Sequence, residues 1–246
     1  MFILILLQGG IPKILPYFYP LMLTSSLLDV VAGIVSMNAI RISSISLISP
    51  ISSFNPVFTT LIAAFAIGEI PSPTKMLGII VIVIGAYLLN VTDIRGGVLT
   101  PFKKLITNRG VQLFFLANLL WGITPIFQKQ AIFQTVPTMP VFPSFFGGIL
   151  VSIFIAPFAV RRLKNSFLPI QRNVWWFLLL GLLGAIAQWA AFTAFSQTNV
   201  GYATAIFKLS TLFTILWGAI FFREERIKER FLGGGVMVLG TILIVA

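Results

Sequence analysis

The chain has 246 residues, of which 58% are hydrophobic and only 9% are charged, and its mean hydropathy is +1.02. A soluble protein of this length needs far more charged surface, so the composition predicts an integral membrane protein. The net charge of +11 comes from short basic clusters between apolar runs, a pattern that is typical of membrane loops and argues against a nucleic-acid partner.

Apolar runs separated by charged or Pro/Gly-rich segments are long enough to cross a hydrocarbon core of about 30 Å as helices. Helix is expected because lipid leaves backbone groups no other partner, whereas a membrane barrel would show alternating apolar and polar residues. In chain order the predicted spans are Tyr17–Ile40, Ser44–Gly68, Thr74–Val91, Gln112–Ile132, Met139–Val160, Asn173–Gln197, Val200–Phe222 and Arg230–Ala246. The expected fold class is an all-α polytopic membrane protein with about eight spanning helices.

The chain repeats itself with a shift of 155 residues. The less common residues that superpose are Glu69 on Glu224, Phe58-Thr59 on Phe213-Thr214, Gly78 on Gly233 and Gly85 on Gly240. Because the shift spans five predicted helices, an odd number, the two copies should have opposite orientations in the membrane. That is the pattern of an inverted-repeat transporter, whose substrate site lies near the bilayer midplane between the copies. The repeated glycines, at heptad distance in each copy, are expected at a close helix contact.

The repeat also predicts the domain organisation. We expect residues 1–92 to form an incomplete first repeat of three helices, residues 93–110 a basic loop between the repeats, and residues 111–246 a complete second repeat of five helices. Relative to the second copy, the first lacks about two N-terminal helices, so either the true start lies upstream or the chain is a shortened variant.

Basic residues predict an orientation. Most of the 17 Lys and Arg residues fall in the predicted loops on one side of the membrane. The positive-inside rule assigns that side to the cytoplasm, which leaves the C-terminus outside.

Several short motifs repeat the pattern of a known family. Leu120-Trp121-Gly122 lies in the fourth span, Pro56-Val57-Phe58-Thr59 is followed by Gly68-Glu69, and Phe213-Thr214 is followed by Glu224. A glycine-bearing helix follows each acidic turn. Over nearly its whole length the chain resembles the EamA-type permeases of the drug/metabolite transporter superfamily. The resemblance implies a ten-helix inverted repeat of five plus five helices that exports or exchanges small metabolites, amino acids or drugs.

The chain departs from that family pattern at three points. The first two helices are absent, and Thr211 stands in the second copy where the first has Pro56. Members of the family usually keep both termini in the cytoplasm, whereas the distribution of basic residues places the C-terminus outside.

Asp29 and Lys208 are the plainly ionisable residues within the predicted spans. Counted from the same membrane face, they differ in depth by roughly 6 Å. Our hypothesis is that both face the central cavity, paired with each other or charged in turn during transport, with Asp29 as proton carrier. In the alternative interpretation Lys208 extends to the nearer interface and Asp29 bonds to a neighbouring backbone or hydroxyl group. Both readings stay open at this point.

Other polar and aromatic residues within the spans could line a substrate pathway. They are Asn38, Ser53 and Asn55 in the first copy and Trp121, Gln128, Gln188, Ser210 and Thr211 in the second. The repeat places Ser53 opposite Lys208, and both positions should lie near the pseudo-twofold axis. The alternative is ordinary helix packing, with Trp as an interfacial anchor.

Three further residues are expected to be structural or gating. Pro56, with Pro50, removes backbone donors and should bend its helix, which exposes carbonyl groups. Glu69 and Glu224 lie just past helix ends, where each could bond to the N-terminus of the following helix.

Together these features predict a secondary transporter or exporter of small metabolites by alternating access, coupled to a proton or a counter-substrate. No ATP-binding motif is present, and no nucleophile–base pair in the spans suggests an enzyme. With no Cys and no His in the chain, we expect no metal site and no cofactor. Lys208 favours solutes with an anionic group, such as amino acids or organic acids. The alternative is a lipid-linked sugar flippase-like or non-transporting membrane-interaction protein. We expect a prokaryotic inner membrane, and the sequence leaves a homodimer open.

Overall fold

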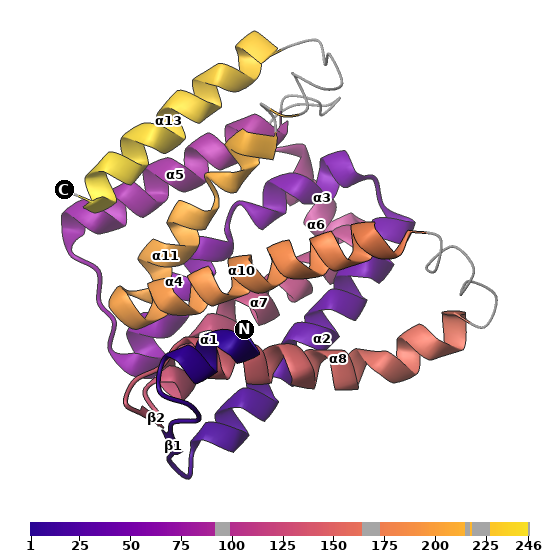
Figure 1. Cartoon of the computed structure of the whole chain (residues 1–246). Helices are drawn as coiled ribbons and strands as arrows, with labels where there is room; N and C mark the ends of the chain where they lie inside the picture. The colour runs from indigo at the N-terminus through magenta and orange to yellow at the C-terminus, as the bar shows by residue number, and fades with distance from the viewer. Residues whose placement is uncertain (92–98, 164–172, 215–216, 218–226, 246) are drawn as a thin grey trace. The chain divides into compact units, whose positions relative to one another are not determined.

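The computed structural model describes residues 1–91, 99–163, 173–214, 217 and 227–245, and its elements are almost all helices (Figure 1). The helices are α1 Phe2–Leu7, α2 Phe18–Ile42, α3 Ile45–Ser52, α4 Asn55–Ile67, α5 Pro73–Val91, α6 Thr100–Thr107, α7 Arg109–Ile132, α8 Val141–Leu163, α10 Val174–Gln197, α11 Val200–Phe207 and α13 Ile227–Val245. The strands β1 Lys13–Ile14 and β2 Thr135–Val136 form a short antiparallel ribbon. The predicted all-α fold class is confirmed.

Five helical stretches of the described residues are long and apolar enough to cross a membrane. They are Phe18–Ile42, Pro50–Ile67, Arg109–Ile132, Val141–Val160 and Val174–Gln197. Pro73–Leu89 and Gly233–Val245 are shorter apolar helices. Each of the eight predicted runs coincides with helix in its described part, but two of the runs are interrupted.

The chain forms two compact units, which we describe separately. The first unit contains residues 1–30 and 127–198, and the second contains residues 31–126 and 199–246. These units are not the two copies of the sequence repeat, because each unit takes segments from both copies. Helices α2 and α7 each contribute residues to both units.

In the first unit, α8 packs against α10 and α1. Its core is an aromatic cluster around Phe18, which is fully buried and lies within 5.5 Å of the ring centroids of Tyr19, Phe142 and Phe146. Such ring contacts stabilise a core beyond the area they bury. The cluster therefore anchors the start of α2 to α8.

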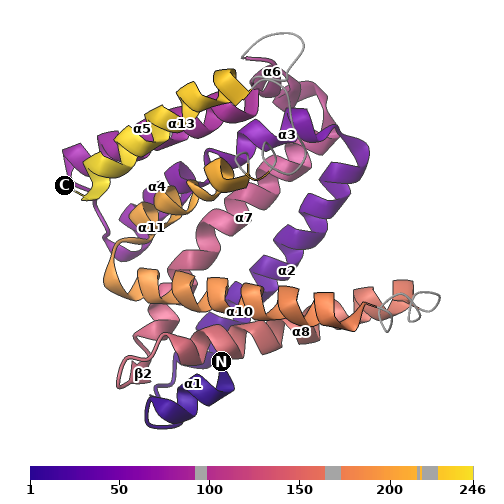
Figure 2. The same ribbon diagram turned by 45° about the horizontal axis from the view of Figure 1, so that its top comes forward.

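In the second unit, α5 and α13 lie antiparallel and side by side (Figure 2). A Cβ atom at Gly78 would be 2.8 Å from the Gly240 carbonyl oxygen, and one at Gly85 would be 2.6 Å from the Gly233 carbonyl oxygen. Only glycine lets two helix backbones approach this closely. The close contact predicted from the repeated glycines is confirmed. Gly78 contacts Gly240, the repeat counterpart of Gly85, and Gly85 contacts Gly233, the repeat counterpart of Gly78.

The second unit also contains two helices that break at equivalent places. Helix α3 ends at Ser52 and α4 begins at Asn55, with a turn at Ser53 and Phe54 between them. Helix α11 ends at Phe207, a turn follows at residues 208–209, and helix resumes at residue 210. The shift of 155 residues takes the first turn onto the second. The breaks are therefore a shared feature of the inverted repeat.

Backbone hydrogen bonds are rearranged in the same way at both breaks. The N–H groups of Ser53 and Phe54 donate to Pro50 and Ile51 at 3.2 Å, and those of Lys208 and Leu209 donate to Ala205 and Ile206 at 3.0 and 2.9 Å. These are the tighter bonds of a 3₁₀ turn, to the carbonyl three residues back.

The two breaks have different local causes. The bend predicted from Pro50 and Pro56 is confirmed, because these residues lie inside α3 and at the start of α4 and lack the N–H that a continuous helix needs. Thr211 takes the place of Pro56 in the second copy, so local sequence did not predict the break at Lys208.

Candidate functional site

Lys208 lies in the turn that follows α11. Its side chain is half-buried, and the next residue, Leu209, packs against the core formed by α5, α11 and α13. Among the described residues, the Lys208 ammonium group has no hydrogen-bonding or ion-pairing partner. Its repeat counterpart Ser53 is only 1% exposed. The equivalent turns therefore carry a basic group in one copy and a small hydroxyl in the other.

The first break is held against α7 by the Asn55 side chain, and the Asn118 side chain bonds within α7. The Asn55 Nδ2 group donates to the Asn118 carbonyl oxygen at 3.0 Å, and Asn118 Nδ2 donates to the Phe114 carbonyl oxygen at 3.1 Å. One turn further along α7, a Cβ atom at Gly122 would be 3.2 Å from Phe58 Cβ. The glycine of the Trp-Gly motif thus permits close packing of α7 on α4, while Asn55 positions the start of α4.

Glu69 binds the N-terminus of a helix that is distant from it in the sequence. Its Oε2 atom accepts a hydrogen bond of 2.8 Å from the N–H of Val200, the first residue of α11. A carboxylate is favoured there by the helix dipole and by the N–H groups that the first turn leaves unbonded. We predicted the N-terminus of the following helix, which is α5. The hydrogen bond described here joins Glu69 to α11.

Two further contacts fasten this loop and the first turn of α5 to α11. The Ser72 N–H donates to the Tyr202 hydroxyl at 3.3 Å, and the Lys75 ammonium lies 5.5 Å from the centre of the Tyr202 ring. Packing reinforces them, because a Cβ atom at Gly201 would overlap the Thr60 hydroxyl of α4. The start of α11 is therefore tied to both α4 and the loop before α5.

We expect Glu69→Ala to lower the free energy of unfolding by about 1–3 kcal/mol, because it leaves the Val200 N–H without an acceptor. Glu69→Gln keeps an acceptor and loses only the charge, so its cost should be about 0.3–1 kcal/mol. Thermal unfolding in detergent measures both. The exposed, neighbouring Thr74→Ala is the control, and equal stability of all three variants would contradict this assignment.

In the first unit the structure brings Asp29 and Gln128 together. The Gln128 Nε2 group, on α7, donates to Asp29 Oδ2, on α2, at 3.1 Å. Both side chains are half-buried. An amide that donates to a carboxylate supports its charge without neutralising it. The alternative expectation for Asp29 was a backbone or hydroxyl partner, and the partner described here is a side-chain amide.

Gln188 extends the polar groups of the first unit. Its Nε2 atom donates to the Ser144 carbonyl oxygen at 3.2 Å, which links α10 to α8. A Cβ atom at Gly147 would be 3.8 Å from Gln188 Nε2 and 3.9 Å from the hydroxyl of Ser26. We call Ser26, Asp29, Gln128, Ser144 and Gln188 the polar seam of the first unit. Ser26 and Ser144, both buried, were missed because a serine in a span resembles ordinary packing.

The remaining predicted residues have mixed surroundings. Asn38 is exposed on α2, Ser210 is exposed and its carbonyl accepts the Thr214 hydroxyl, and Trp121 is half-buried on α7. Thr211 is half-buried and bonds through its backbone to the Lys208 carbonyl oxygen.

Pro56 is buried, and its carbonyl oxygen accepts the Thr60 hydroxyl at 2.7 Å. Glu224 lies outside the described residues. Asp29 and Lys208 belong to different units, so their pairing stays a prediction.

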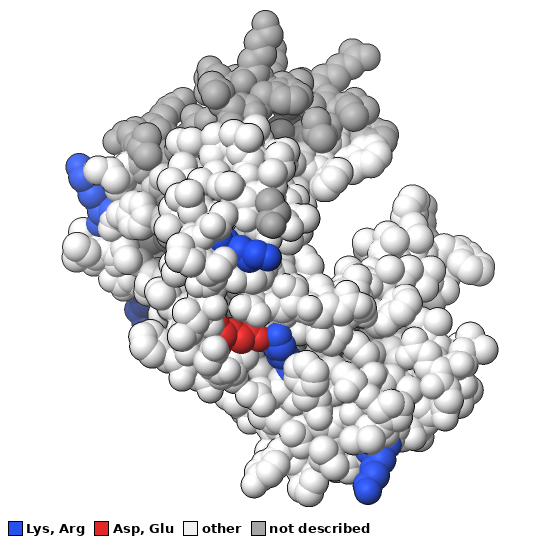
Figure 3. Space-filling model, turned by 90° about the vertical axis from the view of Figure 1, so that its left-hand side faces the viewer, with Lys and Arg blue, Asp and Glu red and all other residues white. Residues whose placement is uncertain are grey.

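Charge is sparse on the described surface. On the face drawn in Figure 3 most atoms belong to uncharged residues, with a few basic and acidic side chains between them. Within the described part of the chain, no group of three or more Asp or Glu residues could hold a metal ion. The arrangement is suited to recognising a solute through a few polar groups in apolar surroundings.

Comparison with known proteins supports the same architecture. The EamA-like transporter family matches residues 1–91 and 108–246. Two transporters of Helicobacter pylori, from different strains and each described as an uncharacterized transporter, are 25% identical to this chain over 139 residues. The match covers 55% of this chain and 44% of the length of each relative.

A solved crystal structure, described only as that of a protein, covers 96% of this chain and 88% of its own length with a TM-score of 0.61. At 12% sequence identity this likeness shows the fold alone.

Proposed function

Because this chain belongs to the EamA-like transporter family, we propose that it is a secondary transporter or exporter that moves small metabolites by alternating access. The family and the apolar helices make it an integral multi-pass membrane protein with a transport role. The observation that carries the finer proposal is the pair of equivalent helix breaks, at Ser53 in one copy and at Lys208 in the other. Broken helices near the midplane provide the polar backbone groups that such carriers use to bind solutes.

The substrate class follows from Lys208. An ammonium group within an apolar span is costly unless it is compensated, and no described residue compensates this one. A carboxylate or phosphate on the solute would supply the missing charge. In this proposal the substrates are solutes with an anionic group, such as amino acids or organic acids, and neutral drug-like solutes are weaker substrates.

Energy for transport would come from a proton or a counter-substrate. In this proposal Asp29 carries the proton, and the Gln128 amide holds its carboxylate in place in the charged state. The EamA-like transporter family suggests a non-enzymatic role for the chain. We assign the protein to a prokaryotic inner membrane, where it could act as a homodimer.

A counterflow assay tests the function directly. Purified protein is reconstituted in liposomes preloaded with one unlabelled amino acid or organic acid, and uptake of the labelled solute is followed. Transient accumulation above that of empty liposomes is expected for at least one anionic solute. Absence of counterflow for every soluble candidate, together with scrambling of a fluorescent lipid, would contradict the proposal and favour the flippase-like alternative.

We expect Asp29→Asn to abolish accumulation driven by a pH gradient while counterflow continues. Asparagine can still bond to Gln128 but cannot carry a proton, so coupling is lost and exchange is kept. Uptake with and without an imposed pH gradient measures the two separately. Thr24→Ala, on an exposed position of the same helix, is the matched control, and undiminished gradient-driven accumulation by Asp29→Asn would exclude this role.

A further inference from the structure

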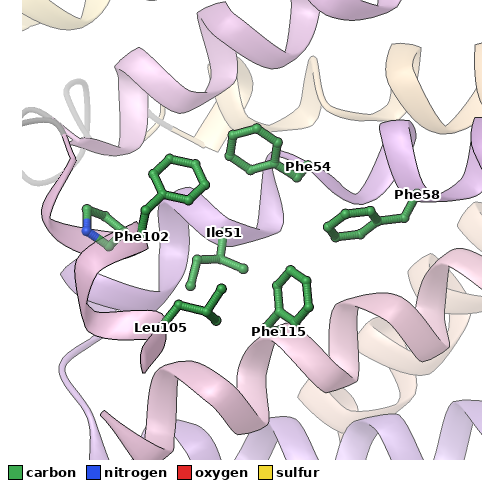
Figure 4. A pocket seen from close by; sticks show the side chains of 7 residues that line it. Ile51, Phe54, Phe58, Phe102, Leu105 and Phe115 are labelled. Atoms are coloured by element: carbon green, nitrogen blue, oxygen red, sulfur yellow. The ribbon is translucent and has the colours of Figure 1, made fainter. Parts of the chain in front are cut away.

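The second unit contains an apolar pocket beside the first helix break. Its volume is about 160 Å³. The side chains that line it are Ile51, Phe54, Phe58, Pro101, Phe102, Leu105 and Phe115 (Figure 4). They come from α3, the following turn, α4, α6 and α7, and each of them is apolar. Apolar cavities of about this size stay dry and take up apolar ligands.

Aromatic rings keep this space open. Phe54 and Phe102 meet edge to face at 5.3 Å between centroids, and Phe58 and Phe115 do so at 5.4 Å. Each of these rings is thus held in place by a neighbouring ring and does not turn into the pocket. Phe102 is 41% exposed although it lines the pocket, so the pocket is accessible at this side chain.

The pocket is covered by a short amphipathic helix with a basic face. On α6, Pro101 is buried and Leu105 half-buried, and both line the pocket, whereas Lys103 and Lys104 are exposed. A helix of this kind lies in the membrane interface, with its apolar side toward the acyl chains and its lysines near anionic headgroups.

The charged residues of α6 are all basic. Helix α6 carries Lys103 and Lys104 and no acidic residue, and Glu69 of the same unit is bound to the start of α11. The lysines of α6 therefore attract an anion from the membrane surface without competition from an acidic side chain on the same helix. A ligand that satisfies both the lysines and the pocket must combine a negative charge with a hydrocarbon chain.

We propose that α6 and the pocket form a binding site for an anionic phospholipid of the bilayer. The phosphate lies at the ammonium groups of Lys103 and Lys104, and the end of an acyl chain occupies the pocket. The chain contacts Phe54, which belongs to the turn between α3 and α4. The lipid therefore stabilises the first helix break, and this site is separate from the solute site at Lys208.

Native mass spectrometry of the delipidated protein tests the site. The protein is titrated with phosphatidylglycerol or with phosphatidylcholine that carries the same acyl chains. We expect at least about tenfold tighter binding of the first tightly held phosphatidylglycerol, because two lysines near a membrane surface both attract an anionic headgroup. Glycerol 3-phosphate, which carries the charge without the chain, should show no binding at the same concentration.

Two variants separate the parts of the site. Replacing both lysines (Lys103→Gln with Lys104→Gln) should remove the preference for phosphatidylglycerol. Leu105→Phe, which fills the pocket, should weaken the binding of both lipids about tenfold. Lys13→Gln and Leu182→Phe, at exposed positions of the first unit, are the matched controls and should change nothing. Equal binding of the two lipids by the unmodified chain would overturn the proposal. So would an unchanged preference in the lysine variant, or unchanged affinity in Leu105→Phe. If Leu105→Phe is not monodisperse, Ile51→Phe fills the same pocket.

Discussion

Lys208→Met should reduce the apparent affinity for an anionic solute by about 10–100-fold, since a hydrogen bond between charged groups contributes about 1.5–3 kcal/mol. The same substitution removes a charge that has no partner among the described residues. The variant should therefore be at least as stable as the unmodified protein, because an uncompensated charge in apolar surroundings is unfavourable. Solute counterflow in liposomes and thermal unfolding in detergent measure the two effects on the same preparation.

The combination of lost transport with retained stability identifies a substrate-binding role. A lysine that only extends to the membrane interface would affect stability and leave transport of the anionic solute unchanged. Lys208→Arg keeps the charge in a different geometry, so partial activity is expected. Lys13→Met, an exposed basic residue of the first unit, is the control. Undiminished counterflow by Lys208→Met would exclude Lys208 from the solute site.

Gly85→Ala should lower the free energy of unfolding by about 1–3 kcal/mol, the usual cost of overpacking a well-packed contact. The added Cβ would be 2.6 Å from the Gly233 carbonyl oxygen and 2.8 Å from the Met237 nitrogen, and both of these are backbone atoms. A backbone cannot move aside as the end of a side chain can, so the two helices must separate. Gly85→Leu should prevent recovery of monodisperse protein. Thermal unfolding and size-exclusion chromatography in detergent provide the measurements.

The run of three glycines within α13 provides a graded control. A Cβ atom at Gly233 would be 2.8 Å from the Gly85 carbonyl oxygen, and one at Gly234 would be 2.9 Å from a methyl group of Leu212. One at Gly235 would meet nothing within 4 Å. Alanine should therefore be costly at Gly233, milder at Gly234, and neutral or stabilising at Gly235, since alanine favours a helix over glycine by about 0.5–1 kcal/mol. Equal effects at the three positions would contradict the backbone contact described for α5 and α13.

Much of the fold could be predicted because it depends on composition and on repetition. The apolar runs predicted the positions of the helices, and the repeated glycines predicted the contact between α5 and α13. Pro50 and Pro56 predicted the first helix break, since proline lacks the N–H of a continuous helix. The break at Lys208 has no proline, and only its place in the repeat relates it to the first.

The candidate site was predictable as a set of residues but not as a set of contacts. An aspartate, a lysine and several amides within apolar spans are unusual enough to single out Asp29, Lys208, Gln128 and Gln188. Their partners could not be read from the sequence, because Asp29 and Gln128 are far apart along the chain. The hydrogen bond from Val200 to Glu69 could not be predicted for the same reason, because α11 is distant from Glu69 in the sequence.

The sequence by itself determined that this protein lies in a membrane and that its structure is helical. Each of these follows from properties that need no contact: apolar length and the need of every backbone group for a partner in lipid. Only the tertiary structure decided which polar group meets which. It joined Glu69 to α11 and Gln128 to Asp29, and it left the Lys208 ammonium without a described partner. The physical reason is that these contacts depend on how distant helices pack against each other, and apolar spans are too alike for hydrophobicity alone to select their neighbours.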